Sequence, residues 1–115
     1  MYFKLTYRQS SDKRQVGDFF LCGALKLDIG QTNCCELRLP ESSEFEPVVF
    51  ATILCKQDGK GYSIIKRTDF QELQINGKRL NICQSLKDGD LISFVIDGQT
   101  ISLLFSVYND GEYSA

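Results

Sequence analysis

The sequence contains no histidine. Without imidazole there is no Ser-His or Cys-His nucleophilic pair, no His-ligated zinc and no side chain whose unperturbed pKa lies near neutrality. These absences exclude most hydrolase mechanisms. An enzyme that used carboxylates alone would need a roomy cleft, which a chain of 115 residues seldom encloses. We therefore expect a protein that is not an enzyme and that binds no cofactor.

Cysteine is present without a metal-binding pattern. The five cysteines, an odd number, are Cys22, Cys34, Cys35, Cys55 and Cys83. No two of them have the short gaps that repeat in zinc sites. Adjacent cysteines such as the pair at 34 and 35 form a disulfide only with strain, and the other three lie among apolar residues, where a free cysteine behaves as a small buried hydrophobe. The pattern predicts reduced thiols, no metal site and a cytoplasmic location.

The sequence also lacks a large excess of charge of either sign and lacks long apolar runs. The chain has 13 basic and 15 acidic residues, for a net charge of −2, whereas a surface that neutralises a phosphate backbone is strongly basic. No apolar run approaches the roughly 20 residues of a membrane helix. We expect neither nucleic-acid binding nor membrane insertion by this segment. Its length fits one domain over residues 1–115, and its ending, soon after a strand-like run, would also suit the N-terminal part of a longer protein.

Turn dipeptides dominate what is present. Asn-Gly and Asp-Gly pairs favour the positive φ angles of tight hairpins, and they occur at positions 58–59, 76–77, 88–89, 97–98 and 110–111. Between them lie short runs rich in β-branched and aromatic residues, which predict strands at 61–67, 71–75, 78–82, 90–96 and 99–108. The C-terminal half is predicted to be a series of hairpins, of which the one turning at Asn76-Gly77 is the clearest.

The N-terminal half has the same character. Alternation of apolar and polar residues predicts a strand at 2–8, and the polar segment 10–18 is predicted to be a loop. Further strands are expected within 18–30, 35–40 and 48–56, with an exposed loop at 41–47. Alternation also predicts six phenylalanines to be core residues, namely Phe3, Phe19, Phe20, Phe50, Phe94 and Phe105. Short strands without helices indicate an all-β fold in which two antiparallel sheets pack face to face as a β-sandwich.

Several fragments in this order resemble the forkhead-associated (FHA) domain family. They are LDIGQ at 27–31, ELRL at 36–39, ATI at 51–53, YSI at 62–64, INGKRL at 75–80 and LKDGDLI at 86–92. The hairpin turn followed by LKDGDLI is the most specific part. The resemblance implies an FHA/SMAD-like sandwich, a fold that binds phosphothreonine peptides in the typical members of the family.

The residues that hold phosphate in the family are not retained. Where the family has an arginine after its isoleucine-glycine pair, this chain has Gln31. The family's serine, arginine and histidine correspond by resemblance to Pro47, Val48 and Phe50. Its later serine and asparagine correspond to Asp69 and Gln71. If the longer loop at 41–47 shifts the alignment, Ser42 or Ser43 takes the serine position instead.

Charge strengthens this conclusion, because phosphothreonine carries close to two negative charges and needs converging donors. The loops that would hold phosphate in the family carry acidic residues here at 44, 46, 69 and 72. The nearby cations are Lys66 and Arg67. We predict a non-catalytic module that binds or scaffolds a protein or peptide through its loops. The alternative is an atypical phosphothreonine receptor built on these two cations and the hydroxyls of Thr32 and Thr68. The oligomeric state stays open. The candidate loop residues are Gln31, Thr32, Asn33, Lys66, Arg67, Thr68 and Asp69.

Overall fold

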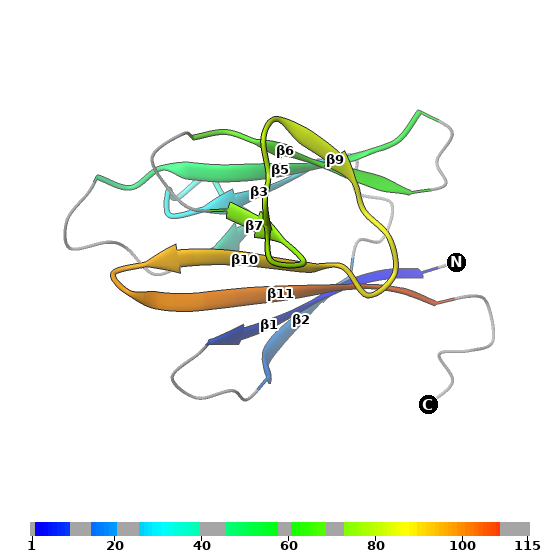
Figure 1. Ribbon diagram of the computed structural model, residues 1–115, viewed down its shortest axis with the longest axis horizontal. Coiled ribbons are helices and arrows are strands. Elements are labelled where there is room, and N and C mark those ends of the chain that lie inside the picture. Colours follow the sequence, from blue (N-terminus) through cyan, green and yellow to red (C-terminus); the bar gives the residue numbers. More distant parts are fainter. Residues whose placement is uncertain are drawn as a thin grey trace.

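The strands form two sheets in a computed structural model that describes residues 2–9, 15–20, 26–39, 46–57, 61–68 and 73–108 (Figure 1). The six-stranded sheet has the spatial order β2 (Gln15–Phe20), β1 (Tyr2–Gln9), β11 (Gln99–Tyr108), β10 (Leu91–Ile96), β7 (Leu73–Ile75) and β8 (Lys78–Arg79). The five-stranded sheet has the order β4 (Leu37–Arg38), β3 (Lys26–Gly30), β5 (Val49–Cys55), β6 (Tyr62–Lys66) and β9 (Cys83–Ser85). The described residues contain no helix, and so no helix that could cross a membrane. The all-β sandwich predicted from the sequence is confirmed.

Both sheets are antiparallel, as predicted, except at one pair of strands. β3 and β4 run parallel, with Ile29 opposite Leu37. The chain between them turns back beside β3, and the Asp28 amide donates to Glu36 Oε1 at 2.9 Å. The Leu39 amide then donates to the Gly30 carbonyl at 2.7 Å. A connection of six residues, 31–36, thus replaces the longer crossover that parallel strands usually need.

The core lies between the sheets and is built from the alternating apolar positions of both. Leu27, Ile29 and Ile53 face it from the five-stranded sheet, while Ile92 and Leu103 face it from the other. Aromatic rings fill the remaining space, as the alternation predicted. Phe50, Phe94 and Phe105 are buried and Phe3 is partly buried, whereas the side chains of Phe19 and Phe20 lie outside the described residues.

Two strands differ from the sequence-based expectation. Gln15–Asp18, predicted to be loop, belong to β2, where the backbone pairs with β1. The run 78–82 was predicted to be one strand, but only Lys78 and Arg79 pair with β7. The chain then crosses to the other sheet and forms the unpredicted strand β9. Cys83 therefore lies on an edge strand and is exposed, so the prediction that it is buried is wrong. Cys55 is partly buried and packs against the core, and Cys22 lies outside the described residues.

The predicted hairpin at Asn76-Gly77 is confirmed. Ile75 pairs with Lys78, and the two turn residues have φ angles of 55° and 82°. These are the left-handed angles of a type I′ turn, which right-twisted strands favour.

Gly77→Val is expected to destabilise the domain by about 1 kcal/mol or more, because a β-branched residue is strained at this φ angle. Denaturant unfolding followed by far-ultraviolet circular dichroism measures the change. Lys78→Val, at the next and exposed strand position, is the control and should leave the midpoint nearly unchanged. Equal midpoints for the two variants would contradict the assignment of the turn.

Candidate functional site

Three loop segments converge at one end of the five-stranded sheet. β3 ends at Gly30, β5 begins at Val49, and β6 ends at Lys66. Because neighbouring strands here are antiparallel, with Gly30 opposite Val49 and Ala51 opposite Lys66, these ends are adjacent. The segments 31–36, 46–48 and 67–68 consequently form one rim, which contains five of the seven residues proposed from the sequence, and the sixth, Lys66, is the last residue of the adjoining strand β6. The seventh, Asp69, lies outside the described residues.

Gln31 joins two of these segments instead of facing solvent. Its side chain is among the fully buried ones, at 1% exposure. Its backbone amide donates to the Val48 carbonyl at 2.8 Å, and its Oε1 accepts from the Val48 amide at 3.2 Å. The side-chain oxygen of a glutamine is an acceptor, so it can satisfy the backbone amide of the neighbouring segment. The residue at the family's arginine position thus contacts protein backbone here.

The close approach of these segments depends on Gly30. A Cβ atom at this position would lie 2.5 Å from the Val48 carbonyl oxygen and 2.7 Å from Val49 Cα. Both neighbours are backbone atoms, which cannot rotate away as a side chain does. Glycine is therefore the residue that fits between the strand ends.

Residues 32–36 form a tight turn at the tip of the rim. The Cys35 amide donates to the Thr32 carbonyl at 3.2 Å, and Thr32 Oγ1 lies 3.3 Å from Cys35 Sγ. Cys35 is buried, whereas Asn33 and Cys34 are exposed at the tip. Both cysteines are free thiols. The Asn33 side chain is an exposed polar group of this turn.

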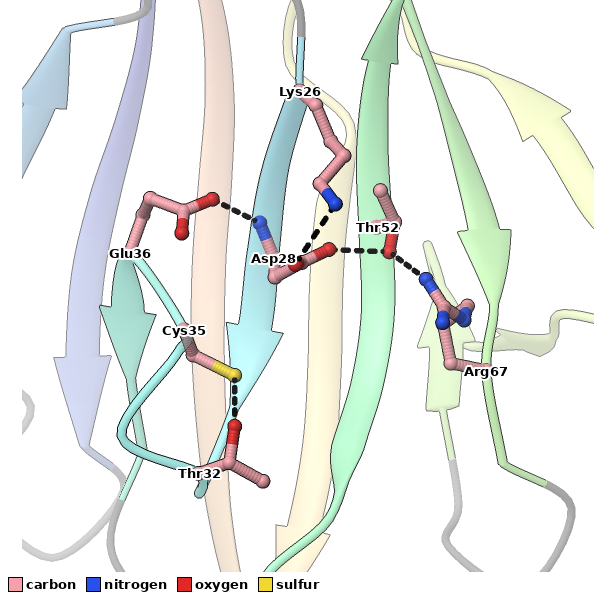
Figure 2. Close-up of polar contacts among 7 residues, drawn as sticks. All are labelled: Lys26, Asp28, Thr32, Cys35, Glu36, Thr52 and Arg67. Carbon is pink, nitrogen blue, oxygen red and sulfur yellow. Dashed lines mark hydrogen bonds and ion pairs between the residues drawn. The ribbon is translucent and has the colours of Figure 1, made fainter.

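Arg67 belongs to a polar row on the outer face of the five-stranded sheet (Figure 2). Its Nη1 donates to Thr52 Oγ1 at 2.8 Å, and the Thr52 hydroxyl donates to Asp28 Oδ1 at 2.7 Å. Lys26 Nζ completes the row at 3.4 Å from Asp28 Oδ2. Thr52 is buried beneath these charged groups. Sequence reasoning missed Asp28 and Thr52, although polar residues between the core positions Leu27, Ile29 and Ile53 were the available signal.

The structure does not bring Thr32 and Arg67 together. Figure 2 shows Thr32 at the end of β3 and Arg67 beyond β5, with its guanidinium turned toward Thr52. Lys66 is partly buried, and its backbone amide donates to the Ile82 carbonyl at 2.8 Å. Thr68 Oγ1 is buried without a hydrogen-bond partner. Thr32 and Arg67 thus bond to different neighbours, Cys35 within the same turn and Thr52 on β5.

The positions that correspond by resemblance to the family's phosphate-binding residues are apolar or buried where the structure describes them. Pro47 is exposed, Val48 is partly buried, and Phe50 is 1% exposed. Phe50 has no partner in β3, because the register skips from Ala51 to Val49. Its ring lies 5.5 Å from that of Phe94 in the opposite sheet. This bulge directs the side chain at the family's histidine position into the core.

Negative charge is also present at the rim. Glu46 is exposed, while Glu44, Asp69, Gln71 and Glu72 lie outside the described residues. Within the described part of the chain, no group of three potential metal ligands is found.

Comparison with known proteins identifies the fold. The FHA domain of a hypothetical protein of Arabidopsis thaliana superposes with a TM-score of 0.77 at 14% identity, covering 99% of this chain and 91% of that one. The chain has the FHA fold. The FHA domain of the Chlamydia trachomatis protein CT664 gives 0.73 at 14% identity, covering 95% of this chain and 100% of that one. The resemblance read from the sequence fragments is thus confirmed at the level of the fold.

A third structure with the FHA fold contains a ligand. The yeast Dun1 FHA domain, solved in complex with a doubly phosphorylated peptide derived from Rad53, gives a TM-score of 0.66 at 20% identity. The match covers 99% of this chain and 82% of that one. No protein-family model matches the sequence. No curated protein matches it either.

Proposed function

We propose that this chain is a non-catalytic protein-interaction module with the FHA fold whose phosphothreonine site is degenerate. It docks a protein or peptide partner through its loops, irrespective of threonine phosphorylation. The observation that carries the proposal is Gln31. This residue stands where the family's arginine is expected, and its amide is buried against the backbone of Val48.

The energetics of phosphate recognition support the same proposal. Each charge-assisted hydrogen bond to a phosphate is worth about 1.5–3 kcal/mol. Proline and valine offer no side-chain donor, and a neutral glutamine cannot provide a charge-assisted bond. Loss of two or three such bonds would turn a micromolar interaction into one weaker than about millimolar. Exposed Glu46 adds repulsion at the rim.

Arg67 is the feature that favours the alternative, an atypical phosphothreonine receptor. Its side chain is exposed, and a guanidinium has five N–H donors, of which the bond to Thr52 engages one nitrogen. The exposed ion pair that a phosphate would form with Arg67 contributes roughly 0–1 kcal/mol. That gain is too small to replace the missing donors. We therefore assign Arg67 a structural role, in which it bonds to Thr52 on the outer face of the five-stranded sheet.

The proposed setting follows from charge and cysteine usage. A net charge of −2 disfavours a nucleic-acid partner. The four described cysteines are free thiols, which suits a cytoplasmic protein. A protein or peptide is therefore the partner that we propose.

A titration with paired peptides tests the proposal. A threonine-peptide library is offered in phosphorylated and unphosphorylated form at physiological salt, and the affinities are measured by fluorescence anisotropy. We expect no difference between the two forms of any peptide. Arg67→Ala is tested in parallel, with Arg38→Ala, an exposed arginine on β4, as the matched control. A peptide bound at micromolar affinity only when phosphorylated, and lost in Arg67→Ala alone, would establish the alternative.

A further inference from the structure

The strand β9 is an edge of the five-stranded sheet, and no described strand covers its outer side. It pairs with β6, with Ser63 opposite Ser85 and Ile65 opposite Cys83. In the spatial order of the described strands, β9 comes last, and Figure 1 shows it beside β6. No other described strand pairs with it. An open edge can accept an extended peptide as an additional strand.

The hydrogen-bond pattern shows which backbone groups of β9 point outward. The Ile82 carbonyl accepts from the Lys66 amide at 2.8 Å, and the Leu86 amide donates to the Tyr62 carbonyl at 2.9 Å. Alternate residues of an antiparallel strand bond to the same neighbour, so positions 82, 84 and 86 face β6. The amides and carbonyls of Cys83 and Ser85 consequently face away from the sheet.

The side chains of this edge are not those of a protected edge. Natural proteins guard open edges with charged residues or proline within the strand. Residues 81–85 are all exposed, uncharged and free of proline. They include Ile82, whose 74% exposure is the largest among the exposed apolar side chains of the described residues. An apolar contact point therefore lies next to the outward backbone groups.

Positive charge flanks β9 on both sides in the sequence. Lys78 and Arg79 precede β9, Lys87 follows it, and all three are exposed. The segment from Leu73 to Lys87 contains these three cations and no acidic residue, in a chain whose net charge is −2. The acidic residues that follow are engaged. Asp88 Oδ1 accepts from the Val107 amide, while buried Asp90 accepts from Asn76 Nδ2 and the Lys87 amide.

We propose that β9 binds an extended acidic peptide, which adds to the five-stranded sheet as a sixth strand. The peptide backbone would pair with Cys83 and Ser85, an apolar side chain would cover Ile82, and its carboxylates would meet the flanking cations. A second copy of this chain fits less well, because antiparallel pairing centred on Cys83 would bring Lys87 of each copy toward Arg79 of the other. This interaction needs none of the loop residues discussed above.

The test uses a short capped peptide in which glutamate and valine alternate. Binding is followed by the amide signals of the whole chain in a nuclear magnetic resonance titration. We expect the largest shifts at Cys83 and Ser85. Two control peptides, one with lysine in place of glutamate and one with proline in place of valine, should each bind at least about tenfold more weakly. The first loses charge complementarity, and the second loses backbone donors.

Variants of the protein locate the interaction. Ser85→Pro removes one outward amide, and Ser85→Ala changes the same side chain while keeping that amide. Only the proline variant should weaken binding, by about tenfold. The triple variant Lys78→Glu, Arg79→Glu and Lys87→Glu leaves β9 unchanged and should reverse the preference, so that the lysine peptide binds better than the glutamate peptide. The triple variant tests the contribution of charge to binding even if Ser85→Pro is unfolded. A thermal melt of Ser85→Pro shows whether that variant is folded.

The other outcomes would overturn the proposal. Equal affinities for the glutamate and lysine peptides would exclude charge complementarity. Shifts confined to residues 31–36 would place binding at the loops, and self-association through β9 would make a second copy the occupant. Absence of binding by the glutamate peptide would exclude strand addition. None of these results depends on whether phosphothreonine is recognised, so the two proposals fail separately.

Discussion

Phe50→Ala is expected to lower the free energy of unfolding by about 3–5 kcal/mol. The Phe50 ring is 1% exposed and lies 5.5 Å from the Phe94 ring of the opposite sheet. Its removal loses the transfer free energy of a buried aromatic side chain and leaves a cavity that a sandwich held by both sheets fills only in part. Urea unfolding followed by far-ultraviolet circular dichroism measures the loss.

A double-mutant cycle separates the ring contact from general burial. Phe94→Ala and the double variant are measured under the same conditions as Phe50→Ala. We expect the double variant to be less destabilised than the sum of the single variants, with a coupling of about 0.5–1.5 kcal/mol for the aromatic pair. A loss below about 1 kcal/mol for Phe50→Ala would be that of an ordinary substitution. It would contradict the placement of this side chain in the core and return it to the rim.

Gly30→Ala is expected to destabilise the domain by about 1–3 kcal/mol. The added Cβ would lie 2.5 Å from the Val48 carbonyl oxygen and 2.7 Å from Val49 Cα. Because these are backbone atoms, β3 and β5 must separate locally to admit it. That separation would also stretch the two bonds between Gln31 and Val48. The variant should therefore lower the unfolding midpoint and increase amide hydrogen exchange at Gln31 and Val48.

Gly61→Ala provides the matched control, since neither Gly30 nor Gly61 is among the glycines with a positive φ angle. A Cβ at Gly61 would meet only atoms of the Lys56 side chain, at 3.7 Å or more, so its stability should change by no more than about 0.5 kcal/mol. Equal losses of unfolding free energy in Gly30→Ala and Gly61→Ala would indicate a general effect of replacing glycine and not a clash specific to Gly30. An unchanged unfolding midpoint for Gly30→Ala would mean that the ends of β3 and β5 are farther apart than the structure places them.

The fold was predictable because its signals are local. Asn76-Gly77 favours left-handed φ angles whatever surrounds it, and the observed angles of 55° and 82° match. The alternation of Leu5 and Tyr7 with the polar residues Lys4, Thr6 and Arg8 likewise fixes which face of the first strand is buried. β9 was missed because Cys83–Ser85 has neither strong β propensity nor alternation. It is a strand only because β6 offers it backbone partners.

The site was less predictable, because its geometry depends on contacts between distant segments. The sequence indicated that Gln31 replaces an arginine, but not that its amide is buried against Val48, 17 positions away. It placed Arg67 at the end of the predicted strand 61–67. It did not show that Arg67 bonds to Thr52, or that Thr52 bonds in turn to Asp28, contacts that join three separate strand regions. Side chains of this kind take their direction from whichever neighbour the sheet order brings within hydrogen-bond distance.

The sequence by itself determined the strand-rich character of this protein, its tight turns and the absence of imidazole chemistry. These properties follow from residue identity and short-range spacing. The tertiary structure alone decided that a bulge in β5 directs Phe50 into the core and that Gln31 connects two loop segments by hydrogen bonds. It also decided that β9 is the last described strand of its sheet. Each of these depends on long-range strand pairing, and one residue of register changes which side chains are buried.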